Sequence, residues 1–298
     1  MNLHGLDLFG EPIQPKLAGP LAERFIFPPF TVLDGRSIEW IERKRLWISH
    51  GIESEIGRGE NLLSFSKALL NRGVNEERSN TSIFDPVLCE LMYSWFCPPK
   101  GQIIDPFAGG SVRGIVATML GNQYWGCDLR EEQIDANKKQ SKDPVWVSGD
   151  SEQMLKDAPE ADFVFSCPPY GNLEKYSDSE NDLSNMSHES FVDKYFRIIK
   201  LAIGKLKNNR FAAFVVGDFR SKEGFYRGFV GQTVNAFESA GAKFYNDAIL
   251  ATPVGTAPLR VTRQFDSTRK FAKVHQNILV FVKGNPKKAA ERINNEFQ

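Results

Sequence analysis

The sequence predicts an α/β domain in which a mostly parallel β-sheet is covered by helices on both faces. From Ser82 onward, short apolar runs alternate with segments of helical periodicity, and this alternation is typical of strand–helix–strand units. Several runs end directly in an aspartate, a glycine or a proline pair, residues that commonly terminate strands. No apolar run approaches the roughly 18 residues needed to cross a bilayer, so we expect no membrane partner.

The expected strands are short runs rich in β-branched, aromatic and other apolar residues. In chain order they are residues 102–105, 123–128, 145–147, 162–166, 211–217, 243–251 and 275–282. The segments between them repeat apolar residues at helical spacing. The expected helices are residues 85–96, 112–120, 131–140, 191–207 and 225–240. Only a loop, residues 252–274, is expected between the last two strands, so these two strands can pair antiparallel.

The composition excludes several classes of protein. Lys and Arg number 37 and Asp and Glu number 37, so the formal net charge is zero, and any contact with nucleic acid must come from a local basic patch. The four cysteines are far apart and form no C-x-x-C pair, so we expect neither a metal site nor a disulfide framework. Residues 1–20 lack the pattern of a signal peptide, which favours a cytoplasmic location.

The chain divides near residue 80. We expect residues 1–80 to form an N-terminal extension, because they lack the strand–helix alternation. Trp40 and Trp47 are seven positions apart and share a helical face, which predicts that they pack on the main domain, residues 81–298. The cations between them, Arg43, Lys44 and Arg45, are expected to face solvent or nucleic acid.

A glycine-containing turn follows the first expected strand. The segment Asp105-Pro106-Phe107-Ala108-Gly109-Gly110 leads into a helix. The two glycines let the backbone approach a ligand closely, and the helix N-terminus offers unpaired N–H groups. A nucleotide-like cofactor is expected outside the carboxyl ends of the strands.

Acids also end the next two expected strands. Asp128 ends the second strand, and Asp150 follows the third. A carboxylate at the end of the second strand can accept both hydroxyls of a ribose. Together with Asp105, these acids predict a site for an adenosine-type ligand at one edge of the sheet.

The most specific segment is Ser166-Cys167-Pro168-Pro169-Tyr170, which follows a buried strand. The two prolines remove N–H donors and stiffen the loop, leaving its carbonyls to project outward. Such a carbonyl can accept a hydrogen bond from an amino group on a flat substrate, and Tyr170 can stack on the ring of an extruded base.

The segments at 105–110 and 167–170 resemble the cofactor and catalytic motifs of the amino-methylating DNA methyltransferases, which act on N6 of adenine or N4 of cytosine. The resemblance covers about residues 82–284. It implies a Rossmann-like S-adenosylmethionine-dependent methyltransferase fold, with a mostly parallel seven-stranded sheet and an antiparallel last strand, here preceded by the N-terminal extension. That extension resembles those beside methylases of bacteriophages and prophages, which implies a bacterial host cell and a role in DNA methylation or restriction–modification.

The resemblance also implies roles for individual residues. Residues 107–110 would surround the methionine part of S-adenosylmethionine, Asp128 its ribose and Asp150 its adenine amino group, while residues 81–86 resemble an additional cofactor-side motif. The cofactor-binding residues implied are Ser82, Phe84, Asp105, Pro106, Phe107, Ala108, Gly109, Gly110, Asp128 and Asp150. The catalytic residues implied are Ser166, Cys167, Pro168, Pro169 and Tyr170.

The chain departs from the family at Cys167, where Asp, Asn or Ser is usual. A thiol is a weak acceptor, so Ser166 or a proline carbonyl must complete the clamp on the amino group. An alternative is that Cys167 acts as a nucleophile in methylation at carbon 5 of cytosine. The choice between adenine and cytosine stays open.

The segment 252–274 is the expected DNA contact. Its five cations can track a phosphate backbone, and two phenylalanines lie among them. The cations are Arg260, Arg263, Arg269, Lys270 and Lys273. The expected partner is double-stranded DNA with the target base flipped out, and a homodimer is left open. The polar segment 171–187 is expected to form a lid.

Two further alternatives concern the acceptor. The same motifs serve methylation of an amide or amine in RNA or protein. The domain could also bind DNA without transferring a methyl group.

Overall fold

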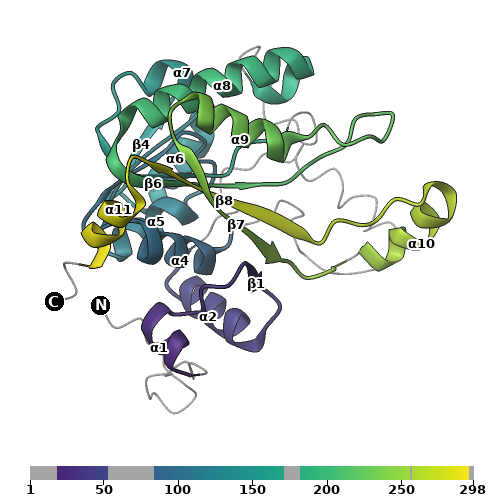
Figure 1. Cartoon of the computed structure of the whole chain (residues 1–298), viewed down its shortest axis with the longest axis horizontal. Helices are drawn as coiled ribbons and strands as arrows, with labels where there is room; N and C mark the ends of the chain where they lie inside the picture. Colours follow the sequence, from purple (N-terminus) through teal and green to yellow (C-terminus); the bar gives the residue numbers. More distant parts are fainter. Residues whose placement is uncertain (1–18, 53–83, 171–181, 256, 295–298) are drawn as a thin grey trace.

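The computed structural model describes residues 19–52, 84–170, 182–255 and 257–294. Within these ranges the strands form an eight-stranded sheet in the order β1-β7-β8-β6-β5-β2-β3-β4 (Figure 1). The strands are β1 (Val32–Asp34), β2 (Gln102–Asp105), β3 (Gln123–Asp128), β4 (Val145–Ser148), β5 (Ala161–Ser166), β6 (Leu206–Val216), β7 (Lys243–Ala251) and β8 (His275–Lys283).

Helices cover both faces of this sheet. The described helices are α1 (Pro20–Phe25), α2 (Ile38–Ser49), α4 (Pro86–Phe96), α5 (Val112–Met119), α6 (Glu131–Gln140), α7 (Ser151–Met154), α8 (His188–Lys205), α9 (Phe229–Ser239), α10 (Ala257–Thr268) and α11 (Pro286–Asn294). One apolar cluster joins the sheet to α2, α4, α5, α6 and α11, and a second joins its other face to α8 and α9. None of the described helices combines the length and the apolar character that a membrane span requires.

The pairing confirms the predicted fold. Strand β8 is antiparallel to both β6 and β7, and the other neighbouring pairs are parallel. Strands β2 to β8 are therefore the expected seven-stranded, mostly parallel sheet of a Rossmann-like methyltransferase fold, with its last strand antiparallel. The eighth strand, β1, comes from the N-terminal extension and pairs with β7.

The prediction of a loop between the last two strands is wrong. Residues 252–274 are not a plain loop, because α10 occupies their middle. Val261 and Phe265 lie one helical turn apart, and Pro258 stands in the first turn, where a missing N–H costs nothing. The density of charges in this segment obscured its helical spacing.

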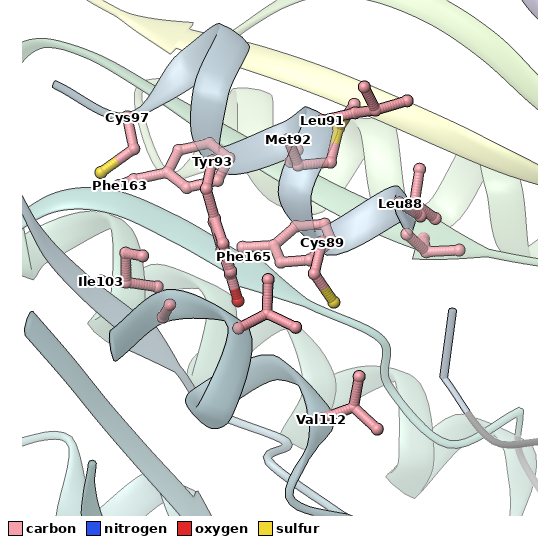
Figure 2. Close-up of a cluster of buried hydrophobic side chains, with 14 of the residues drawn as sticks. Leu88, Cys89, Leu91, Met92, Tyr93, Cys97, Ile103, Val112, Phe163 and Phe165 are labelled. Atoms are coloured by element: carbon pink, nitrogen blue, oxygen red, sulfur yellow. The ribbon is translucent and has the colours of Figure 1, made fainter. Parts of the chain in front are cut away.

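The packing of α4 fixes the first strand–turn–helix unit. Asp85 caps this helix by accepting from the Val87 N–H, and the helix is apolar nearly all round. Figure 2 shows Tyr93 projecting from α4 beside the rings of Phe163 and Phe165, and the ring centroids are 6.3 and 5.4 Å apart. The Tyr93 hydroxyl donates to the carbonyl of Arg113 at 2.9 Å, so α4 also holds the start of α5.

The described part of the extension packs on α4 through α2. Trp40 and Trp47 are both buried, and their indole N–H groups donate to Asp85 and Glu90 of the main domain. Arg43 does not face solvent as expected, because it donates to Glu90 through two nitrogens. The boundary expected near residue 80 lies outside the described residues.

Candidate active site

A cavity of about 400 Å³ opens at the carboxyl ends of β2, β3, β4 and β5. This volume lies within the usual range of small-molecule sites. The turn at 105–110 and the loop at 167–170 both contribute to its wall. The predicted residues on the wall are Phe84, Pro106, Phe107, Gly109, Gly110, Asp128, Asp150, Cys167, Pro168, Pro169 and Tyr170. Topology therefore brings the two motifs, about 60 residues apart, to one cavity.

The glycine turn is tied to the end of β3. Gly109 has a φ of +52°, a left-handed conformation that favours glycine. Its N–H donates to the Asp128 carboxylate at 3.0 Å, and its carbonyl accepts from the Asn137 amide at 2.7 Å. These two hydrogen bonds fix the position of the glycine turn at the cavity wall.

Asp105 lies behind the cavity wall and is fully buried. Its carboxylate accepts from the Arg113 guanidinium, the Tyr124 hydroxyl and the Ser166 hydroxyl at 2.5, 2.7 and 2.5 Å, and from the Phe107 N–H at 3.1 Å. Asp105 thus connects the glycine turn to the strand that carries the proline loop. Its geometry is that of a positioning residue, and Ala108 and Ser166 are likewise buried behind the wall.

Arg113 is a residue that sequence reasoning missed. Besides pairing with Asp105, its guanidinium donates to the carbonyls of Phe107 and Ala108 at 2.5 and 2.9 Å. It also lies 4.5 Å from the centroid of the Phe84 ring. A charged side chain inside an otherwise apolar helix, eight positions after a buried aspartate, was the available signal.

Asp128 and Asp150 both face the cavity. Asp128 also accepts from the backbone N–H of Arg130 at 2.9 Å, and burial raises the pKa of its carboxyl above the ordinary value. Asp150 caps α7 by accepting from the Glu152 N–H at 3.0 Å. Its other oxygen accepts from the buried ammonium of Lys194 at 2.7 Å, a second partner that sequence reasoning missed.

The proline loop faces the same cavity. The Tyr170 hydroxyl accepts from the Gln276 amide at 3.0 Å and lies 3.5 Å from the Cys167 sulfur. The Tyr170 ring meets the ring of Phe229 edge-on at 6.4 Å. Gln276 of β8, a third residue missed from the sequence, therefore orients the tyrosine on the cavity wall.

The N-terminal extension contributes Lys44 to the wall. The Lys44 ammonium donates to Asp85 at 3.0 Å, and the same carboxylate oxygen accepts from Trp40 at 3.2 Å. Lys44 and Asp85 thus form an ion pair beside Phe84 at the cavity. Ser82, predicted for this wall, lies outside the described residues.

The predicted DNA-contacting residues lie on and after α10, and Arg263, Arg269, Lys270 and Lys273 do not line the cavity. Arg260 belongs to α10, and Arg263 is exposed on the same helix. Arg269 is exposed and pairs with Asp266 at 3.9 Å. Lys270 lies against Gly224, and partial burial lowers the pKa of Lys273. Thr252 and Pro253, at the start of this segment, do line the cavity, as does Gln276 just after its end.

The described residues contain no cluster of three or more His, Cys, Asp or Glu side chains that could hold a metal ion. The described cysteines are all free.

Comparisons with known proteins gave structural similarity only. No protein-family model and no curated protein matches the chain. Similar solved structures include TrmN from Thermus thermophilus, at 14% identity and a TM-score of 0.45 over 66% of this chain and 48% of that one. A methyltransferase from Pyrococcus furiosus is 14% identical, with a TM-score of 0.45 over 76% and 95%. A candidate DNA modification methylase, also from Thermus thermophilus, is 18% identical, with a TM-score of 0.34 over 46% and 51%.

The matched region spans about half the length of TrmN.

Proposed function

We propose that this chain transfers a methyl group from S-adenosylmethionine to an exocyclic amino nitrogen in double-stranded DNA, at N6 of adenine or N4 of cytosine. One observation carries the proposal. The glycine turn with Asp128 and Asp150, and the proline loop with Tyr170, line the same cavity. A donor held by the first group therefore faces a flat ring held by the second.

The residues on the wall fit the cofactor. Gly109 and Gly110 leave room beside the turn, and the Asp128 carboxylate can accept hydroxyl groups of a ribose. Asp150 can accept from an adenine amino group while Lys194 and α7 hold it in place. When bound, S-adenosylmethionine supplies an activated methyl group on a sulfonium centre. The protein's work is then mainly to position the acceptor.

The surroundings of Ser166 and Cys167 favour one kind of hydrogen-bond acceptor for the amino group of the target base. The Ser166 hydroxyl donates to Asp105 and is buried, so it does not face the base. A thiol at Cys167 is a weak acceptor. Backbone carbonyls of the proline loop therefore serve best as the hydrogen-bond acceptors of the clamp, and the Tyr170 ring, oriented by Gln276, serves as the stacking surface.

Methylation at carbon 5 of cytosine is the second candidate, because Cys167 lies on the cavity wall. This reaction needs a thiolate nucleophile. Cys127 also lies on the wall, but burial raises its pKa to about 12 and keeps it protonated, so Cys167 would have to be the nucleophile. A duplex containing 5-fluorocytosine distinguishes the two reactions. A covalent adduct through Cys167 would replace the amino-methylation proposal.

The acceptor is tested by transfer of tritiated methyl groups to duplex DNA, RNA and protein in parallel. We expect label in duplex DNA. Label in RNA or protein alone would assign the activity to those acceptors, and cofactor binding with no transfer would indicate a silent binding domain. The resemblance of the extension to phage and prophage methylases favours a bacterial host cell and a DNA-modification role.

The pH dependence of cofactor binding tests the role of Asp128. Ribose hydroxyls donate to the ionised carboxylate, so binding weakens as the pH falls through the raised pKa of this group. We expect Asp128→Asn to weaken binding of S-adenosylhomocysteine about 10–100-fold, because a hydrogen bond to a charged group contributes about 1.5–3 kcal/mol. Calorimetric titrations at a series of falling pH values should show binding weaken for the wild type as Asp128 is protonated, and weaken less for the variant.

Asp143 provides the matched control, because its side chain is exposed after α6. The variant Asp143→Asn should follow the wild-type pH profile. Equal affinities of the wild type and Asp128→Asn at neutral pH would contradict a ribose contact.

Lys44 and Asp85 offer an ion pair to the zwitterionic end of the methionine part. We expect Lys44→Met to weaken binding of S-adenosylhomocysteine about tenfold, a loss of about 1.4 kcal/mol. The substitution removes the cation that would pair with the carboxylate of the ligand. Binding of 5′-methylthioadenosine, which lacks that carboxylate, should not change. The exposed neighbour Arg45 gives the control Arg45→Met, and equal losses for both ligands would show that Lys44 acts only on folding.

A further inference from the structure

The chain between β6 and α9 forms a hairpin that extends beyond the sheet on the same side as α10 (Figure 1). The Ser221 N–H donates to the Phe225 carbonyl at 2.8 Å, and the Arg227 N–H donates to the Phe219 carbonyl at 2.9 Å. Gly224 makes the turn with a φ of +93°. Residues 218–228 (the hairpin) therefore form an ordered projection.

The base of the hairpin is anchored to the core. The Asp218 carboxylate accepts from the N–H groups of Phe219 and Phe229 at 2.9 and 3.1 Å. The buried ring of Phe219 packs against Phe229 at 5.5 Å, and Phe229 is the residue that meets Tyr170. The hairpin is thus connected to the tyrosine of the proline loop through a single shared ring.

The tip of the hairpin exposes two aromatic rings. Phe225 is 75% exposed and Tyr226 is 49% exposed. The Arg220 guanidinium lies over the Tyr226 ring at 3.8 Å from its centroid and donates to the Gly224 carbonyl at 2.9 Å. An exposed ring is ordinary on its own. Two adjacent exposed rings on a hydrogen-bonded turn form a surface that is typical of an interaction site.

The charge around these rings identifies the chemistry of the partner. Lys222 and Arg227 join Arg220 on the hairpin, and Glu223 is the one acid among residues 219–228. On the other side, the Lys270 ammonium lies against Gly224, so the cations that follow α10 continue the same surface. Cations for phosphates together with exposed rings for bases are typical of nucleic-acid contacts.

From this arrangement we infer that the hairpin is a wedge that enters the DNA duplex beside the target base. Phe225 fills the space that the extruded base leaves in the stack, while Lys222 and Arg227 contact the flanking phosphates. Proteins that unstack a base step commonly insert an apolar side chain in this way. The inference rests on the proposed DNA substrate and adds the element that holds the duplex open.

The test compares Phe225→Ala with the wild type on two substrates. The first is a duplex that contains a site methylated by the wild type, and the second is the same duplex with an abasic position opposite the target base. Opening a paired target requires unstacking and unpairing, and this cost is smallest for an unpaired base. We expect kcat/KM of the variant to fall about 10–100-fold on the paired duplex and to lie near the wild-type value on the abasic duplex.

Two controls separate the wedge from folding and from general binding. Phe30, in the N-terminal extension, is 64% exposed, and Phe30→Ala should keep wild-type rates on both substrates. Binding of S-adenosylhomocysteine to Phe225→Ala should also be unchanged. The double variant Lys222→Ala/Arg227→Ala should reduce the salt dependence of duplex binding by about two phosphate contacts, whereas the exposed pair Lys287→Ala/Lys288→Ala on α11 should not.

The outcomes distinguish the two levels of the proposal. Wild-type rates for Phe225→Ala on the paired duplex, or an equal loss on both duplexes, would overturn the wedge and leave DNA methylation intact. A wild-type chain that transfers no methyl group to DNA would overturn the proposed function and the wedge together.

Discussion

The variant Asp105→Ala is expected to lose cofactor binding and about 3–5 kcal/mol of the free energy of unfolding, the usual cost of breaking a buried ion pair on one side. The substitution leaves the buried Arg113 guanidinium without its carboxylate. It also removes the acceptor shared by Tyr124, Ser166 and the Phe107 N–H. Denaturant unfolding and calorimetric titration with S-adenosylhomocysteine measure the two losses.

The conservative control is Tyr124→Phe, which removes one hydrogen bond to the same carboxylate. A single hydrogen bond contributes about 1 kcal/mol, so this variant should fold and bind the cofactor. If Asp105→Ala unfolds like the wild type and still binds, the carboxylate does not organise the two motifs.

The second large effect is expected at Tyr170. The variant Tyr170→Ala should bind S-adenosylhomocysteine as the wild type does and lose methyl transfer about 10–100-fold, because stacking on one base contributes about 1–3 kcal/mol. Tyr170→Phe keeps the ring and loses the bond accepted from Gln276, so it should keep most of the activity. Single-turnover transfer rates and binding titrations together separate the two roles.

Two outcomes at Tyr170 would contradict the account. Full activity of Tyr170→Ala would remove the stacking role. A parallel loss of cofactor affinity would show that the ring supports the cavity wall, where it already packs against Phe229.

Much of the fold follows from local sequence pattern. The expected bounds of β2, β3, β7 and α6 match the structure, because each is a sharply bounded run between turn residues. The antiparallel pairing of β7 and β8 agrees with the prediction, but the reason given for it does not hold, because their connection contains α10 and is long enough for a parallel crossover. Strand β1 has only three residues, and its pairing with β7 depends on tertiary contacts that no local pattern contains.

The candidate site, like the fold, was predictable from the sequence only in part. The motif positions show which residues reach the carboxyl edge of the sheet, so most of the expected residues line one cavity. They do not show which of those residues face the ligand. Asp105 and Ser166 turn inward to each other, and the partners Lys44 and Lys194 come from segments more than 40 positions from Asp85 and Asp150. Such pairings depend on how the elements pack, not on their local sequence.

In the proposed reaction, the cavity brings a methyl donor to an exocyclic amino nitrogen of a DNA base. The most direct measurement incubates the protein with unmethylated duplex DNA and S-adenosylmethionine carrying a deuterated methyl group, then identifies the labelled nucleosides by mass spectrometry. We expect label in N6-methyladenine or N4-methylcytosine, and much less label with Tyr170→Ala. Label in 5-methylcytosine, or DNA without label while the protein binds the cofactor, would contradict it.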